Sequence, residues 1–236
     1  EHFGPVVSRG ILLDIARLKG VDHFDDGYPI TGDDLDAAVE AAGVSVEPGD
    51  IVLVRTGQMH FLREGERDRY RMTCPGLSTR SIEWFHRRDP TAPFFLYLSF
   101  HRPHAPFDPP SWALEQYLAE DLPPAPVGDW VDDLAEFRVD FRAESSFGAQ
   151  HPDVRRRALA GYYGSITHID FQVNRLMEVL SDFGLRENTA VLFVSDHGDM
   201  MGDHHFYRKT VGYEGSARVP FLVRLPGGPR GSSEGG

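Results

Sequence analysis

An aspartate and a histidine stand side by side directly after an apolar stretch of this sequence. Residues 190–194 are all apolar and predict a buried strand, and Ser195 separates this strand from Asp196-His197-Gly198. A carboxylate and an imidazole at the carboxyl end of a strand are suited to bind a divalent metal ion, because open α/β sheets place their sites at that edge. A simple turn with a capping aspartate explains the same residues equally well, so both interpretations stay open at this point.

Two further side chains could bind an anion. Lys209 follows the Asp-His pair closely, and His104 lies between prolines in Pro103-His104-Ala105-Pro106. Side chains of these types neutralise the oxygens of a sulfate or phosphate ester. Taken separately, such a lysine is usually solvated and such a histidine is usually a loop residue. His204 and His205 are better explained as loop or supporting imidazoles than as extra metal ligands.

The elements that must position these residues alternate between helix and strand, which predicts an α/β fold. Apolar residues recur on one helical face from Arg155 to Leu180, and Thr31 with Asp34 predicts the start of a helix that Gly43 ends. Ser78 is expected to cap a further helix through His86. The apolar segments that predict strands are residues 9–16, 51–55, 94–100, 190–195 and 219–225.

Composition favours a globular protein and limits the classes of partner that it could bind. The chain has 236 residues, a formal net charge of −12 and one cysteine, Cys74. The negative charge argues against a nucleic-acid partner, the apolar runs are too short for a membrane span, and one cysteine forms no intrachain disulfide. The sequence starts at Glu1 without a recognisable signal peptide, so a fragment is expected and the localisation stays unknown. Residues 127–150 are interpreted as a surface excursion, and residues 227–236 as a disordered tail.

Several motifs occur in the order that they have in the sulfatase family of the alkaline phosphatase superfamily, which residues 88–230 resemble. They are Phe95 to His104, Gly161-Tyr162-Tyr163, His168-Ile169-Asp170 and the block that starts at Asp196. The resemblance implies a partial alkaline phosphatase-like sheet with flanking helices, and hydrolysis of a sulfate, phosphate or phosphonate ester. A small anionic ester is therefore the expected substrate of the parent family.

The same resemblance implies roles for four residues. Asp196 and His197 would be metal ligands, with Ca²⁺ the expected ion ahead of Mn²⁺ or Mg²⁺. His104 and Lys209 would be catalytic residues that contact the sulfuryl or phosphoryl group. Each of these roles comes from the position of the residue in the family pattern.

The main departure from the family pattern concerns the nucleophile. In that family a Cys or Ser in Cys-x-Pro-x-Arg supplies the attacking group, and this sequence contains no such motif. Cys74-Pro75 and Arg80 have the wrong spacing, and Asp25-Asp26 and Asp33-Asp34 are interpreted as a turn and a helix cap. We therefore expect a sulfatase-like core that is incomplete and inactive as it stands.

Residues 1–89 resemble a second family, the cyclases related to bacterial kynurenine formamidase. The motifs are Val7 to Ala16, Tyr28 to Thr31, and Val46 to Gly57 with its Pro48-Gly49-Asp50 turn. This likeness implies a metal-dependent hydrolase of an amide or lactone. The family's metal motif, His-x-Gly-Thr-His-x-Asp, does not occur in the sequence.

Two partial patterns that meet near residue 89 predict two domains, 1–89 and 90–236, and a chimeric origin. The alternatives to a sulfatase-like hydrolase core are a cyclase-family hydrolase and a non-catalytic chimeric remnant. A sheet without its N-terminal strands would expose edges and apolar faces, so association between copies or poor solubility is also expected.

Overall fold

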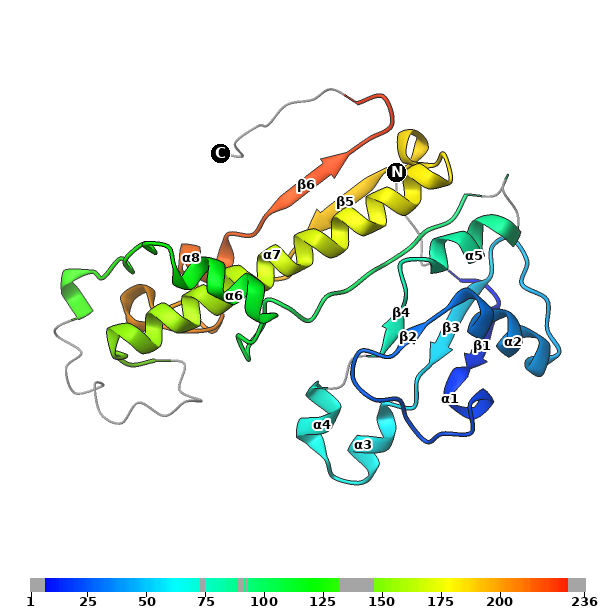
Figure 1. Cartoon of the computed structure of the whole chain (residues 1–236), viewed down its shortest axis with the longest axis horizontal. Helices are drawn as coiled ribbons and strands as arrows, with labels where there is room; N and C mark the ends of the chain where they lie inside the picture. The colour runs from blue at the N-terminus through cyan, green and yellow to red at the C-terminus, as the bar shows by residue number, and fades with distance from the viewer. Residues whose placement is uncertain (1–6, 73–74, 89–90, 92, 132–146, 229–236) are drawn as a thin grey trace. The chain divides into compact units, whose positions relative to one another are not determined.

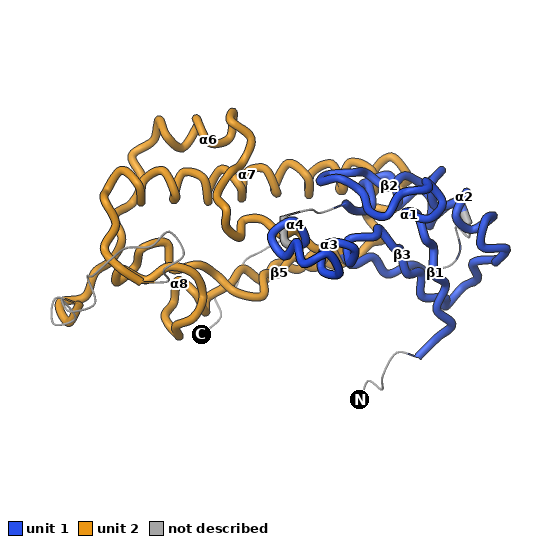
Figure 2. The backbone as a smooth tube through the Cα atoms, turned by 90° about the horizontal axis from the view of Figure 1, so that it is seen from below, with its two compact units in different colours: residues 1–97 blue, residues 98–236 orange. Residues whose placement is uncertain are grey.

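The computed structural model describes residues 7–72, 75–88, 91, 93–131 and 147–228. The chain divides into two compact units, unit 1 (residues 1–97) and unit 2 (residues 98–236), which Figure 2 colours separately. Helices and strands are mixed in both units (Figure 1), so the α/β class predicted from the sequence is confirmed. Most of the expected surface excursion, and the tail beyond residue 228, lie outside the described residues.

Unit 1 is built around a short parallel sheet. Strands β1 (Gly10–Asp14) and β3 (Ile51–Arg55) pair in parallel, with Leu12 opposite Leu53. The predicted strand at residues 9–16 ends early, because the Asp14 side chain accepts a hydrogen bond from the Arg17 backbone N–H and starts helix α1 (Ile15–Leu18). Strands β2 (Pro29–Ile30) and β4 (Gly76–Leu77) form a second parallel pair.

Helix α2 (Gly32–Ala42) begins and ends where its sequence signals predict. The Thr31 hydroxyl accepts a hydrogen bond from Asp34 N at 3.3 Å, and Asp34 Oδ2 accepts one from Thr31 N at 3.0 Å. This capping box satisfies two backbone donors at the first turn, and Gly43 ends the helix in the left-handed region with φ of 64°. Asp34 is therefore a cap, as expected, and it also pairs with Lys19 Nζ at 2.5 Å.

The remaining helices of unit 1 are short. They are α3 (Met59–Arg63), α4 (Arg67–Met72) and α5 (Ser81–Arg88). Trp84 of α5 is buried in the apolar core with residues of β1, α1 and α2. The predicted cap at Ser78 is wrong: α5 begins at Ser81, and the buried Ser78 hydroxyl has no hydrogen-bond partner among the described residues.

The Pro48-Gly49-Asp50 turn ties the start of β3 to the residues that precede β1. Arg9 Nε and Nη2 donate to the two Asp50 carboxylate oxygens at 2.8 and 2.7 Å, and Glu47 N donates to Asp50 Oδ2 at 2.7 Å. These hydrogen bonds, from Arg9 first and then from the Glu47 backbone, lower the pKa of Asp50 to about 2.

Asp50 should make the stability of unit 1 depend on pH in the acid range. Because its folded pKa of about 2 lies below the ordinary 3.8, the ionised carboxylate stabilises the fold above 3.8 and this contribution is lost as the pH falls through the folded pKa. Urea unfolding of the wild type and of Asp50→Asn, at about pH 6 and about pH 3, measures the difference. We expect a larger acid-induced loss in the wild type; equal losses would contradict the role of this carboxylate.

Unit 2 is organised by the long helix α7 (Pro152–Asp182), which packs along helix α6 (Ser111–Leu118) as Figure 1 shows, and strand β5 (Val191–Val194) follows it in the chain. Strand β5 pairs antiparallel with β6 (Phe221–Arg224). Helix α7 and strands β5 and β6 match the sequence predictions closely. Unit 2 also contains the 3-10 turns η2 (Arg186–Asn188) and η3 (Asp203–His205) and the short helix α8 (Glu214–Ala217).

One predicted strand is wrong. Residues 94–100 form no strand, and none of the described residues pairs with their backbone. Phe95 is 89% exposed, although its sequence context favours burial. A strand needs a neighbour that completes its hydrogen bonds, and the apolar pattern by itself does not provide one. Among the described helices, none combines the length and the apolar character that crossing a bilayer requires.

Candidate active site

The four residues that the sequence singled out lie together in unit 2. Lys209 Nζ is 2.6 Å from His197 Nε2, and Asp196 Oδ2 is 3.7 Å from the same nitrogen. The rings of His104 and His197 meet edge to face, with their centroids 6.2 Å apart. Two segments that are distant in the sequence therefore converge just beyond the carboxyl end of β5.

The hydrogen bonds of His197 define its protonation. Its Nδ1 lies 2.7 Å from the Gly198 carbonyl oxygen, which can only accept, so Nδ1 carries the proton and donates it. Its Nε2 then has a free lone pair and accepts a hydrogen bond from the Lys209 ammonium at 2.6 Å. The Ser195 hydroxyl donates to the His197 carbonyl oxygen at 2.7 Å and steadies the backbone.

His104 lies in a group of basic side chains on the proline-rich segment. Its Nδ1 is 2.8 Å from the Ala105 carbonyl oxygen, so this nitrogen also carries a proton. The ring of His101 lies 4.9 Å from that of His104, and Arg102 pairs with Asp108 at 2.5 Å. Sequence reasoning missed His101, although its spacing from His104 across one proline turn was a usable signal.

Burial first, and then the positive charges of His104 and Arg102, lower the pKa of His101 below its ordinary 6.5. The folded chain therefore binds this proton less readily than the unfolded chain, and stability is lost as the pH falls below 6.5 and through the folded pKa. We expect His101→Gln to reduce the loss of stability between about pH 7.5 and pH 5. An NMR titration of the His101 ring with a midpoint at or above the ordinary value would contradict this expectation.

Asp196 and His197 supply too few ligands for a divalent metal ion. The only nitrogen of His197 that is left for a metal is Nε2, and the Lys209 ammonium already lies 2.6 Å from it. The Asp196 side chain is 87% exposed. Within the described part of the chain, no group of three or more His, Cys, Asp or Glu side chains could hold a metal ion. These residues alone do not make a metal site, because Ca²⁺ takes six or more oxygen ligands, and no chemical step is assigned to a metal.

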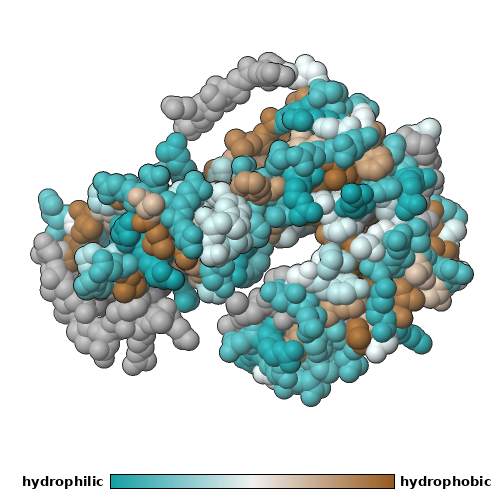
Figure 3. Space-filling model, viewed as in Figure 1, coloured by the Kyte–Doolittle hydropathy of each residue, from teal (hydrophilic) through white to brown (hydrophobic). Residues whose placement is uncertain are grey.

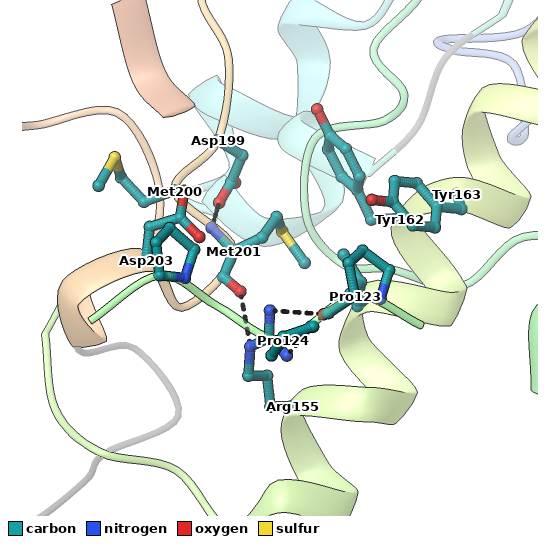
Figure 4. Close-up of a pocket in the computed structure, with 11 residues that line it drawn as sticks. Pro123, Pro124, Arg155, Tyr162, Tyr163, Asp199, Met200, Met201 and Asp203 are labelled. Atoms are coloured by element: carbon teal, nitrogen blue, oxygen red, sulfur yellow. Dashed lines mark hydrogen bonds between the residues drawn. The ribbon is translucent and has the colours of Figure 1, made fainter. Parts of the chain in front are cut away.

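A cavity of about 270 Å³ lies beside the loop that follows His197. Figure 4 shows Arg155 and two tyrosines of α7 on one side of it, and Asp199, Met201 and Asp203 of the loop on the other. Burial raises the pKa of the Asp203 carboxyl and of the Tyr162 hydroxyl. None of the four candidate residues lines this cavity. Cys74, which the sequence spacing excludes as the family nucleophile, lies outside the described residues.

Comparison with known proteins defines the family. The sulfatase family model matches residues 76–235, which is more than half of the chain, and the chain belongs to this family. An arylsulfatase of Clostridium perfringens is 50% identical over 147 residues, which cover 62% of this chain and 31% of that protein. Iduronate 2-sulfatase of Mus musculus is 30% identical over 151 residues, which cover 58% of this chain and 27% of that protein. The chain thus spans about a third or less of the length of these relatives.

Solved structures agree with the predicted fold class. The phosphonate monoester hydrolase of Agrobacterium radiobacter aligns with a TM-score of 0.53 and 22% identity, covering 93% of this chain and 50% of that one. A second phosphonate monoester hydrolase, from Silicibacter pomeroyi, aligns with a TM-score of 0.50 and 25% identity over 63% of this chain and 33% of that one. The predicted alkaline phosphatase-like fold is therefore confirmed.

A second family model, described as a putative cyclase, matches residues 2–93. Both resemblances found in the sequence are thereby confirmed. The two matches overlap at residues 76–93. The domain limits of 1–89 and 90–236, and the chimeric origin, stay predictions.

Proposed function

We propose that unit 2 carries the anion-binding part of a sulfatase-family hydrolase site, which binds a small sulfate, phosphate or phosphonate ester. The observation that carries this proposal is the contact between Lys209 and His197 at 2.6 Å with the His104 ring beside it. The relatives named as an arylsulfatase and a choline-sulfatase support a sulfate ester as the first choice of substrate.

Each of these side chains would have a separate task. The Lys209 ammonium has three N–H groups and uses one of them on His197, so two can donate to ester oxygens. His104 would donate from Nε2 when its ring is protonated. Since the net charge is −12, the overall field repels an anionic ester, and binding depends on these local donors.

The expected behaviour of the chain alone is binding without turnover. Hydrolysis in this family uses the nucleophile of Cys-x-Pro-x-Arg, and residues 1–236 contain no such motif. Incubation with 4-nitrophenyl sulfate should therefore release no 4-nitrophenol above the buffer rate. Release that disappears in Lys209→Ala would show that turnover takes place and that the inactive interpretation is wrong.

Replacement of Lys209 by alanine should weaken anion binding about tenfold or more, because a tenfold loss corresponds to about 1.4 kcal/mol, the size expected for one charged hydrogen bond. Calorimetric titration with 4-nitrophenyl sulfate measures the change, with sodium chloride held constant. Arg175→Ala is the matched control, since it removes one positive charge from the exposed part of α7. Equal affinity of the wild type and Lys209→Ala would reject the proposed site.

A divalent cation should bind only weakly where Asp196 and His197 lie, with Ca²⁺ ahead of Mn²⁺ and Mg²⁺, because these two residues do not make a metal site by themselves and the Lys209 ammonium already lies at His197 Nε2. Two protein ligands leave most of the coordination to water, so a dissociation constant on the order of 10⁻³ M is expected. The binding should disappear in Asp196→Ala and persist in Asp182→Ala, which removes an exposed carboxylate at the end of α7. Tight binding that survives the loss of Asp196 would place the cation elsewhere.

The match of residues 2–93 to the putative cyclase model supports a second candidate. In that case the chain would derive in part from a metal-dependent hydrolase of an amide or lactone, joined to the sulfatase part within residues 76–93. Long-read sequencing of the source locus across this stretch and upstream tests the join. An unbroken frame that includes His-x-Gly-Thr-His-x-Asp supports a natural fusion, whereas two separate genes would reject it.

A further inference from the structure

The loop that carries Lys209 has an unusual backbone. Four residues other than glycine have positive φ values: Met201 at 46°, His204 at 52°, His205 at 62° and Arg208 at 67°. Every such residue in the described part of the chain belongs to this loop. Conformations of this kind are disfavoured for residues with a Cβ and persist only where the surroundings hold them. Specific contacts must therefore hold the loop between Asp199 and Lys209.

Asp199 connects the two ends of this loop. Its Oδ1 accepts hydrogen bonds from Met201 N at 3.0 Å and from Arg208 N at 2.9 Å. Two backbone hydrogen bonds, from Met200 N to Arg208 O and from Gly202 N to Phe206 O, also hold the two sides of the loop together. Because Lys209 follows Arg208 directly, the bond between Asp199 and Arg208 N restrains the backbone from which the Lys209 side chain extends.

Arg155 of α7 holds the other side of the loop. Its Nε donates to Met201 O at 3.2 Å and its Nη1 donates to Pro123 O at 3.3 Å, as the dashed lines of Figure 4 show. A Cβ on Gly202 would lie 2.7 Å from Arg155 Nε, so the guanidinium lies directly against the loop. Asp199 and Arg155 thus meet at Met201, one through its N–H and the other through its carbonyl.

We propose that Asp199 is a positioning residue for Lys209. Its carboxylate accepts the two backbone hydrogen bonds that keep the loop in the conformation bringing the Lys209 ammonium onto His197 Nε2. The inference rests on the proposed anion-binding function, because the position of Lys209 matters only if Lys209 binds an anion. The hydrogen bond between Lys209 and His197 is present without any ligand, so it can be tested separately. Arg155 serves the purpose less specifically, since it also holds the segment that contains Pro123.

Nitrogen NMR of the full chain, with ¹⁵N-labelled histidine, tests this directly. In the wild type, His197 should show a protonated Nδ1 and an Nε2 that accepts a hydrogen bond, and Lys209→Met should shift the Nε2 signal toward that of a solvated imidazole. Asp199→Ala should produce the same shift. Asp199→Asn should keep the wild-type signal, because its amide oxygen can accept both backbone hydrogen bonds.

The pattern of these variants separates positioning from general stability. A folded Asp199→Ala protein that keeps the wild-type His197 signal overturns the proposal, and so does an Asp199→Asn protein that shifts as far as the alanine variant. If Asp199→Ala does not fold, the double variant Asp199→Ala/Arg208→Gly replaces it. Glycine adopts the φ of 67° at position 208 without strain, so this variant removes strain that would hinder folding but supplies no acceptor that holds the loop, and the shifted His197 signal is expected. A wild-type His197 signal in the double variant would also overturn the proposal.

Sulfate titration of the same proteins distinguishes the two proposals. We expect Asp199→Ala to weaken sulfate binding about tenfold, as Lys209→Ala does. A wild type that shows the His197 signal and binds no sulfate rejects the anion-binding function and leaves the positioning role supported. Equal sulfate affinity in the wild type and Asp199→Ala rejects the positioning role.

Discussion

Substitution of Gly161 by alanine is expected to destabilise unit 2 by roughly 1–3 kcal/mol, the cost of forcing extra atoms into a packed interior. In the middle of a helix this exchange ordinarily stabilises by about 1 kcal/mol. The sign reverses here because a Cβ on Gly161 would lie 2.4 Å from the Phe107 carbonyl oxygen and 2.9 Å from Phe107 Cβ. The first of these neighbours is backbone, so it cannot rotate away and the segment around Phe107 must move.

This displacement should also reach the anion site. Phe107 follows Pro106 directly, and the same segment carries His104. We therefore expect Gly161→Ala to weaken sulfate binding in addition to lowering the free energy of unfolding. Gly212→Ala is the matched control, because no atom lies within 4 Å of its added Cβ. Urea unfolding in which Gly161→Ala is as stable as the wild type would show that the contact with Phe107 is not close in solution.

Local signals explain which elements were predictable. The capping box of Thr31 and Asp34 and the left-handed Gly43 are encoded within a few residues, so α2 was placed closely. The apolar periodicity of α7 extends over many turns and was equally clear. Residues 94–100 carry the same kind of apolar signal as β3 and β5, yet they form no strand. The difference depends on which segments lie beside them, and a single segment's pattern contains no information about its neighbours.

The candidate site was predictable at the level of residue types and not at the level of geometry. Asp196, His197, His104 and Lys209 were identified from their order along the chain, and the structure brings them together. The hydrogen bond from Lys209 to His197 was not foreseen, because it depends on the backbone of the intervening loop. Positive φ values at Met201 and His204 have no sequence signal of the kind that glycine provides. The role of Asp199 was hidden for the same reason.

The β5–β6 sheet has one apolar face that no described residue covers. Alternation along the two strands places four large side chains on this face, and each is more than half exposed. They are Leu192 at 59%, Val194 at 53%, Phe221 at 66% and Val223 at 53%. Figure 3 colours one side of the whole molecule by hydropathy and shows hydrophobic residues among the hydrophilic ones at its surface. Contiguous apolar patches of this kind mark contact surfaces or sites of aggregation, which supports the expectation that copies of the chain associate.

Positive charges introduced on this apolar face should therefore weaken the association between copies of the chain. We expect the wild type to sediment as dimers or larger species, and Phe221→Lys/Val223→Lys to raise the apparent dissociation constant at least tenfold, which is about 1.4 kcal/mol. Asn174→Lys/Ser181→Lys is the control: it adds the same two charges at exposed positions of α7 and should leave association unchanged. Because both variants alter the net charge of −12 equally, a difference between them comes from the apolar face itself. A wild type that sediments as a single monomeric species would contradict association through this sheet.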